Sequence, residues 1–141
     1  MAIIKRDTDY ALRALLRLHA ARRITSVPEL VEAASIPIIF LRKIMQKLHA
    51  AGLVESEHGP AGGYRLRRKL SEITVLDVIE AVQGPVVVNQ CFIDPAICEN
   101  VSTCPLRLRL AKLDKRLKEW LAEMNLAAVA RRARRTKGGR G

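Results

Sequence analysis

The sequence predicts a mainly α-helical protein with one small β-hairpin, in which a helical head is followed by a long C-terminal helix. Three observations support this fold class. Apolar residues recur with helical spacing in the first fifty positions, two alternating segments flank a glycine-rich turn, and leucines later repeat with heptad spacing. We therefore expect a head over residues 1–84, a cysteine-containing loop over 85–104, a dimerisation helix over 105–130 and a disordered basic tail over 131–141.

The first three helices are predicted from their apolar periodicity and from the residues at their ends. The first begins near Thr8, and the run from Ser26 to Glu29 has the form of a capping box that opens the second. Ser35 is expected to cap the third helix, which Gly52 ends. Two short helices joined by a tight turn form a helix-turn-helix, whose second helix can enter the major groove of duplex DNA.

A β-hairpin is predicted directly after these helices. Residues 53–57 and 64–67 alternate between apolar and polar side chains, and the turn between them contains three glycines. A helix-turn-helix followed by such a hairpin is a winged helix, and its usual ligand is duplex DNA. A short helix that opens at Thr74, with Asp77 in its first turn, is expected to close the core of the head.

The predicted DNA contacts lie at the start of the third helix and on the hairpin. Arg42 and Lys43 can reach a guanine edge or a phosphate, and an apolar neighbour can contact a thymine methyl group. His58 and Arg65 are placed for the minor groove or the backbone. The alternative is that the apolar residues are core and the basic ones only solvated, which we expect for Ile44 alone. The full predicted set is Ser35, Ile38, Ile39, Phe40, Arg42, Lys43, His58, Gly59, Pro60, Gly62, Gly63 and Arg65.

The composition narrows the possible partners. The chain carries 25 Lys and Arg against 14 Asp and Glu, a formal net charge of +11, and its basic tail is expected to attract phosphates without reading sequence. Aromatic residues make up 4% of the chain, which argues against a single-strand binder that stacks bases. The sequence contains neither a recognisable signal peptide nor an apolar run of bilayer length, so a soluble cytoplasmic protein without membrane contact is expected.

All three cysteines lie close together in the sequence, at Cys91, Cys98 and Cys104. In a reducing cytoplasm, clustered thiols are more often metal ligands or redox switches than disulfides. Their intervals fit poorly the close ligand pairs of structural zinc, whereas iron–sulfur clusters accept wider spacing. An iron–sulfur sensor is therefore predicted, with a thiol–disulfide switch or three inert thiols as alternatives. The histidines all precede this segment by a long stretch of chain, so an enzyme is not expected.

A heptad seam follows Pro105, with apolar residues spaced alternately four and three positions apart. A helix with such a seam needs a partner, so it either folds back onto the head or pairs with a second chain. A homodimer is expected, because it also explains binding to two DNA half-sites. The seam residues are Leu106, Leu110, Leu113, Leu117, Trp120 and Met124.

These segments resemble a known family. The run TDYALRALLRL, the block LRKIMQKLHAAGLVESEHGPAGGYRL and the three late cysteines are similar to the bacterial winged-helix regulators that include IscR, NsrR and RirA, over about residues 1–126. The resemblance implies a dimer crossed through the long helix, regulation of transcription, and a cluster held by Cys91, Cys98 and Cys104.

The resemblance also bears on the fourth cluster ligand. In members similar to IscR a histidine stands three residues beyond the last cysteine, and here that position is Arg107. In members similar to NsrR an aspartate of the first helix, supplied by the other subunit, can serve a 4Fe–4S cluster. This implies Asp9 as a ligand and a 4Fe–4S rather than a 2Fe–2S cluster. Other possible ligands are Asp94, Glu99, His19 and a small molecule.

The sequence as a whole predicts a homodimeric DNA-binding regulator, expected to be a repressor, whose operator binding is controlled by an iron–sulfur cluster. Nitric oxide, iron and redox state are the expected classes of signal. The alternative is a winged-helix regulator without a cluster, which responds through a thiol switch or a small molecule.

Overall fold

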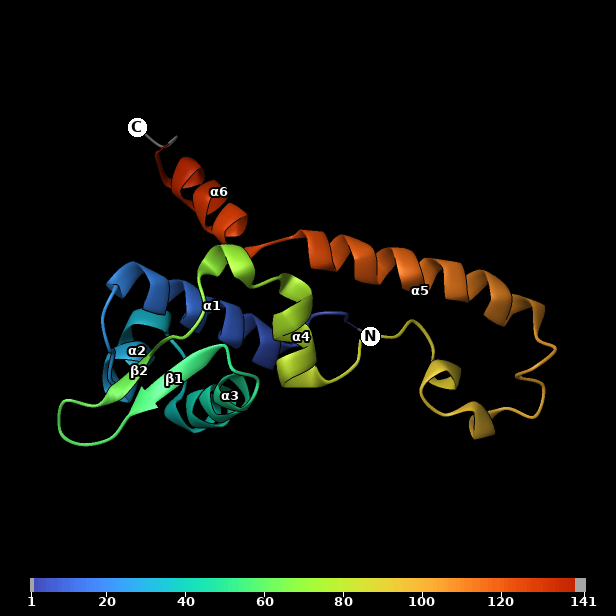
Figure 1. Ribbon diagram of the computed structural model, residues 1–141, viewed down its shortest axis with the longest axis horizontal. Helices are drawn as coiled ribbons and strands as arrows, with labels where there is room; N and C mark the ends of the chain where they lie inside the picture. Colours follow the sequence, from blue (N-terminus) through green and yellow to red (C-terminus); the bar gives the residue numbers. More distant parts are fainter. Residues whose placement is uncertain (1, 139–141) are drawn as a thin grey trace.

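A computed structural model of the protein describes residues 2–138. Figure 1 shows a helical head, from which the long helix α5 extends with a loop at its far end. The predicted fold class is confirmed. The elements are α1 (Arg6–Ala21), α2 (Val27–Ala34), α3 (Ile38–Ala50), β1 (Val54–Glu57), β2 (Gly63–Leu66), η1 (Leu70–Glu72), α4 (Val75–Gln83), η2 (Gln90–Phe92), η3 (Pro95–Ile97), α5 (Pro105–Glu123) and α6 (Leu126–Gly138).

Apolar side chains from α1, α2, α3 and α4 meet in one core inside the head. Leu15, Leu41 and Ile79 are fully buried there. Burying a side chain of this size contributes roughly 1.5–3 kcal/mol relative to leaving it exposed. Leu121 of α5 and Leu126 of α6 belong to the same core, so the C-terminal helices are anchored to the head.

Several helix ends match their predicted capping. The Ser26 hydroxyl accepts a hydrogen bond from the Glu29 N–H at the start of α2, at 3.3 Å. The reciprocal bond of the expected capping box is not formed, because the Glu29 carboxylate accepts from Arg23 and from the Ser26 hydroxyl instead. Thr74 and Asp77 form a reciprocal capping box at the start of α4, with distances of 3.0 and 3.1 Å. Gly52 follows the end of α3 with a φ of 76°, a backbone conformation that glycine adopts without a steric penalty.

The prediction that Ser35 caps α3 is wrong. Ser35 ends α2 in the left-handed region, with a φ of 54°, and its N–H donates to the Val31 carbonyl. Helix α3 begins at Ile38, and no side chain of the described residues caps it. The reason lies in Pro37, which disfavours helical geometry at the preceding Ile36 and so moves the helix start beyond itself.

The hairpin is antiparallel and is tied to the segment that precedes α2. Val54 lies opposite Leu66, and Tyr64 also exchanges two backbone hydrogen bonds of 2.9 Å with Thr25. A Cβ added to Gly63 would lie 2.1 Å from the Thr25 carbonyl oxygen. The wing therefore requires glycine at this close approach of two backbones.

The C-terminal region forms two helices, where the sequence pattern predicts one over residues 105–130. The Val75 N–H donates to the Met124 carbonyl at 2.8 Å, and the Leu126 N–H donates to the Ile73 carbonyl at 2.9 Å. This pairing holds Met124 in an extended conformation and ends α5. The Asn125 side chain then accepts a backbone N–H and opens α6.

Helix α6 continues to Gly138, so the structure differs from the expected disorder over residues 131–138. Alanine and arginine are strong helix formers, and this propensity outweighs the repulsion that a dense basic composition brings. Residues 139–141 of the predicted tail lie outside the described residues. Across residues 2–138, no helix has both the length and the apolar character that crossing a bilayer requires.

Candidate nucleic-acid interface and cysteine pocket

The start of α3 presents apolar and basic side chains to solvent together. The side chains of residues 38–40 are between 41% and 68% exposed, and Arg42 and Lys43 are exposed beside them. Ile44 faces the core, as expected. A helix surface of this kind can place apolar groups against thymine methyls and cations against guanine edges or phosphates.

A chain of side-chain contacts joins α1 to the start of α3. The rings of Tyr10 and Phe40 lie 6.2 Å apart between centroids, and the Arg13 guanidinium lies 5.3 Å from the Tyr10 ring centre. Arg13 also pairs with Asp9 at 2.6 Å. Both members of this ion pair are about half exposed, so it contributes about 0–1 kcal/mol. Asp9 does not line the cysteine pocket of its own chain, and its role as a ligand for a second subunit stays a prediction.

The wing exposes residues 58–60 at its tip. A Cβ on Gly62 would lie 2.2 Å from the Glu57 carbonyl oxygen, so the turn depends on this glycine as well. Arg65 forms an ion pair with Glu55, directly across the hairpin. The predicted contact of Arg65 with DNA therefore requires it to exchange a carboxylate for a phosphate.

Arg23 and Glu29 form an ion pair at the start of α2, close to the wing. Their side chains lie 2.6 Å apart. The hydrogen bond from Arg23 is the main cause that lowers the pKa of Glu29, and the same bond raises the pKa of Arg23. Glu29 thus places a carboxylate at the first turn of α2, where a negative charge is favourable.

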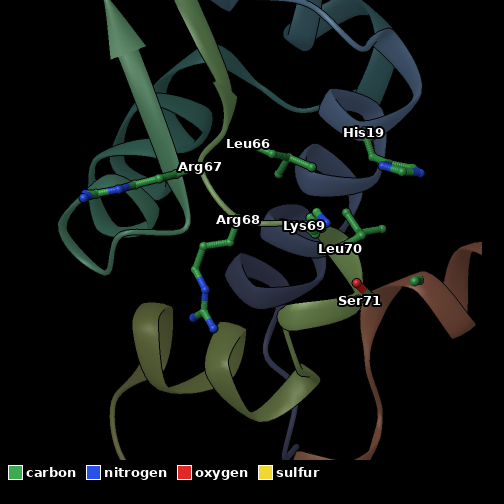
Figure 2. Close-up of a pocket in the computed structure, with 8 residues that line it drawn as sticks. His19, Leu66, Arg67, Arg68, Lys69, Leu70 and Ser71 are labelled. Atoms are coloured by element: carbon green, nitrogen blue, oxygen red, sulfur yellow. The ribbon is translucent and has the colours of Figure 1, made fainter.

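A hollow of about 500 Å³ is lined by residues of α1, β2, η1, α6 and the segment after β2. It is bordered by Arg67, Arg68, Lys69 and His19, and Figure 2 shows the Arg67 and Arg68 side chains extending in different directions. Arg68 donates to the Glu72 carbonyl at 3.1 Å. His19, a possible cluster ligand by sequence, lies here and does not line the cysteine pocket.

The three cysteines line one pocket of about 320 Å³, between the loop after α4 and the start of α5. Cys91 is buried, Cys104 is half-buried at the N-cap of α5, and Cys98 is exposed. No disulfide joins them in the described part of the chain. Within residues 2–138, no three Cys, His, Asp or Glu side chains are grouped closely enough to hold a single metal ion.

A buried aspartate attaches the cysteine loop to α5. Asp114 is 8% exposed, accepts a hydrogen bond from the Val88 N–H at 3.0 Å and pairs with Lys118 at 2.7 Å. The heptad pattern places Asp114 among the polar residues around the seam and does not reveal that a loop covers it. By contrast, Asp94 and Glu99 of the loop are exposed, and Asp94 accepts from the Ala96 N–H within η3.

Arg107 lines the cysteine pocket in an environment that the sequence pattern does not indicate. Its guanidinium carbon lies 5.1 Å from the centre of the Phe92 ring. Its Nε is buried and has no hydrogen-bond partner among the described residues. Buried N–H groups are nearly always paired, because leaving one unpaired forfeits its hydration without return.

Helix α5 divides its apolar residues between two faces. Leu117 and the C-cap residue Met124 pack against the core of the head, whereas Leu106, Leu113 and Trp120 are between 54% and 60% exposed. These three are seven residues apart and therefore form a stripe along the helix. The half-buried Leu110 completes the predicted seam. Part of the seam thus folds back onto the head, and part is exposed in this chain.

Comparisons with known proteins agree with this architecture. Residues 4–132 match the Rrf2 family, described as an iron-dependent transcriptional regulator. The chain is 37% identical over 111 residues to protein aau3 of Rhizobium meliloti, covering 77% of this chain and 72% of that protein. It is 32% identical over 122 residues to the HTH-type transcriptional regulator IscR of Vibrio atlanticus, covering 85% and 70%. The solved structure of CymR (YrzC), the global cysteine regulator of B. subtilis, is similar in fold, with a TM-score of 0.70 at 24% identity over 92% of this chain and 97% of that one.

Proposed function

The chain belongs to the Rrf2 family of transcriptional regulators, and we propose that it is a homodimeric repressor whose operator binding depends on an iron–sulfur cluster. The observation that carries the proposal is that Cys91, Cys98 and Cys104 line one pocket between the head and the start of α5. The family consists of regulators and not enzymes, so the chemistry of this pocket serves control of DNA binding.

Duplex DNA is the ligand of the head. The exposed Arg42 and Lys43 flank the apolar start of α3, and the wing tip supplies a second exposed edge. Side chains of α3 read base edges in the major groove, and the wing contacts the backbone or the minor groove. The net charge of +11 adds attraction that does not depend on base sequence.

A second copy of the chain covers the exposed stripe of α5. The seven-residue spacing of Leu106, Leu113 and Trp120 is the repeat by which two helices pair. Pairing through α5 leaves both heads available for one duplex with two half-sites. It also allows the partner's Asp9 to act as a cluster ligand, since the exposed ion pair of Asp9 with Arg13 is weak enough to exchange.

The donor set fits an iron–sulfur cluster. Cysteine thiolates are the usual ligands of such clusters, and three line this pocket beside the unpaired N–H of Arg107. Because Arg107 occupies the position where a histidine ligand would stand, we favour a 4Fe–4S cluster over a 2Fe–2S cluster. When bound, the cluster supplies a centre that nitric oxide, iron shortage or a change in redox state can alter or remove.

Contacts through α1 connect the cysteine loop to α3, the second helix of the helix-turn-helix. Gln83, which precedes the loop, accepts hydrogen bonds from the Thr8 hydroxyl at 2.5 Å and from the Lys5 N–H at 2.8 Å. Tyr10 lies on α1, as Thr8 does, and it contacts Phe40 at the start of α3. A cluster that binds the three thiols restrains the loop. This restraint favours one orientation of α1 and α3 over others.

The proposal is tested by anaerobic reconstitution of the wild type, Cys98→Ala and the matched loop control Ser102→Ala. Iron and acid-labile sulfide per chain and the visible absorption spectrum are measured. We expect the wild type and Ser102→Ala to take up a cluster and Cys98→Ala to fail. A colourless wild type, or a Cys98→Ala variant with normal iron and sulfide, contradicts the proposal.

The exposure of Cys98 favours a thiol switch as the second candidate function. An oxidant can reach an exposed thiol, and two thiols that give up two protons and two electrons to it form a disulfide. The distinguishing result is a colourless wild type whose DNA affinity changes with peroxide and is restored by a dithiol reductant.

A further inference from the structure

Arg107 brings a positive charge to the lining of the cysteine pocket, and it also carries a buried donor that has no partner among the described residues. The guanidinium is a planar cation with several N–H donors, and its Nε–H is buried with no partner among residues 2–138. A buried donor of this kind indicates a missing acceptor, and the polar groups that share its pocket include three thiols.

We propose that Arg107 is a binding residue for the anionic sulfur core that the three cysteines hold. Its Nε–H donates a hydrogen bond to a sulfur of that core, either thiolate or inorganic sulfide, and its charge offsets the negative charge of the core. This inference rests on the proposed function, because it assigns a role within the same site. Arg107 does not bind iron directly. It has a role of its own at the position where related proteins carry a histidine ligand.

The position of Arg107 on α5 follows from helix geometry. Cys104 is the N-cap of α5, and residues three apart on a helix lie on one face. Arg107 therefore shares the face of Cys104, and both line the pocket. Arg109, two residues further on, is exposed and does not line it.

The ring of Phe92 packs against the guanidinium of Arg107. The ring lies 5.1 Å from the guanidinium carbon, within the range of a cation–π interaction. Phe92 follows Cys91 in the sequence, so this contact links the first cysteine to the helix that carries the last. The contact restricts the motion of the guanidinium.

The charge of Arg107 is expected to act on the redox properties of the core. The reduction potential of an iron–sulfur cluster depends on its net charge and on hydrogen bonds to its sulfurs. Both contributions of Arg107 favour the reduced, more negative form. Their loss should shift the midpoint potential to more negative values and weaken retention of iron.

The test compares Arg107→Gln, Arg107→Lys and the control Arg109→Gln, which loses the same charge from the exposed face of α5. Full-length proteins are reconstituted anaerobically, and iron content, midpoint potential and the rate of iron loss to a chelator are measured. Arg107→Gln should show a more negative potential and about 10–100-fold weaker retention of iron, the usual effect of losing a group that supports metal ligands. Arg107→Lys keeps the charge without the planar donor and should fall between Arg107→Gln and the wild type.

The outcomes separate this inference from the proposed function. A wild type that takes up no iron overturns the cluster and the role of Arg107 together. A loaded wild type whose potential and iron retention are matched by both Arg107 variants overturns the role of Arg107 alone. Far-ultraviolet circular dichroism checks folding, and if Arg107→Gln fails to fold, an Arg107→Lys variant identical to Arg109→Gln overturns the inference.

Discussion

The head and the cysteine arm, defined as residues 85–123, are stabilised in different ways. Leu15, Leu48 and Ile79 of the head are inaccessible to solvent, whereas residues 93–100 of the arm are all exposed. A part-buried hydrogen bond from the Val88 N–H to Asp114 attaches the loop of the arm to α5. The head thus derives its stability from the apolar core, to which Val86 and Leu121 at the two ends of the arm also contribute, whereas the loop of the arm lies outside that core.

This difference indicates where control resides. Segments with few buried apolar contacts open at low free-energy cost, and regulatory elements are drawn from such segments. A ligand that binds the ordered form of the arm stabilises it by mass action. We infer that the signal changes the arm and that the head responds as a unit.

The largest expected effect comes from truncating the core of the head. Leu48→Ala should lower the free energy of unfolding by about 2–5 kcal/mol, because it leaves a cavity in a packed core. Ile97→Ala, at a side chain that is 60% exposed in the arm, should change it by less than about 0.5 kcal/mol in the cluster-free protein. Urea unfolding measures both values. Equal losses for the two variants would contradict the distinction between head and arm.

The same distinction explains how much the sequence could predict. Helices α1 to α4 and the wing follow from local signals, such as the capping box at Thr74 and the glycines of the turn. The burial of Asp114 and the end of α5 at Met124 depend on segments distant in sequence, Val88 and Val75. Periodicity along one helix carries no information about such partners.

The candidate site was predictable to a similar degree. Residue type and spacing indicate that Cys91, Cys98 and Cys104 act together, and they do line one pocket. The unpaired Nε–H of Arg107 could not be predicted, because it results from folding of the loop over the start of α5. Exposure at the start of α3 was predictable, because Ile44 and its helical neighbours already supply a core face.

Removal of Asp114 should give the next largest effect, confined to the arm. Asp114→Ala removes the acceptor of the Val88 N–H and the partner of Lys118, at an expected cost of about 1–3 kcal/mol. Hydrogen exchange should show loss of protection at the Val88 amide with unchanged protection in α1 and α3. Asp94→Ala, at an exposed turn, is the control and should leave the Val88 amide protected. Loss of protection throughout the head would show that the two regions are not separate.

Arg42→Ala tests the head's role in reading DNA. Loss of a contact to a base edge should weaken binding to a selected operator by about 1–3 kcal/mol, with a smaller effect on random duplex. Arg109→Ala removes an exposed charge from the arm and serves as the control. Fluorescence anisotropy at several salt concentrations measures both. Equal losses on operator and random DNA would reassign Arg42 to a phosphate contact.

Glu55→Gln should have the smallest effect. The ion pair with Arg65 is partly exposed, so its loss should change the free energy of unfolding by about 0–1 kcal/mol. Without Glu55 as a partner, Arg65 is free to contact a DNA phosphate. The slope of log affinity against log salt concentration should then steepen by the amount expected for about one phosphate contact. An unchanged salt slope would exclude Arg65 from the DNA interface.

The central claim is that the state of the cysteine pocket controls how the paired heads bind DNA. Its most direct test is the affinity of cluster-loaded and cluster-free wild type for one duplex, selected from random sequence by the loaded dimer. Coupling of 1–3 kcal/mol is usual between two sites, so we expect affinities that differ by about 5–150-fold, with Cys98→Ala equal to the cluster-free protein. Identical affinities and footprints for the loaded and cluster-free forms would contradict the claim.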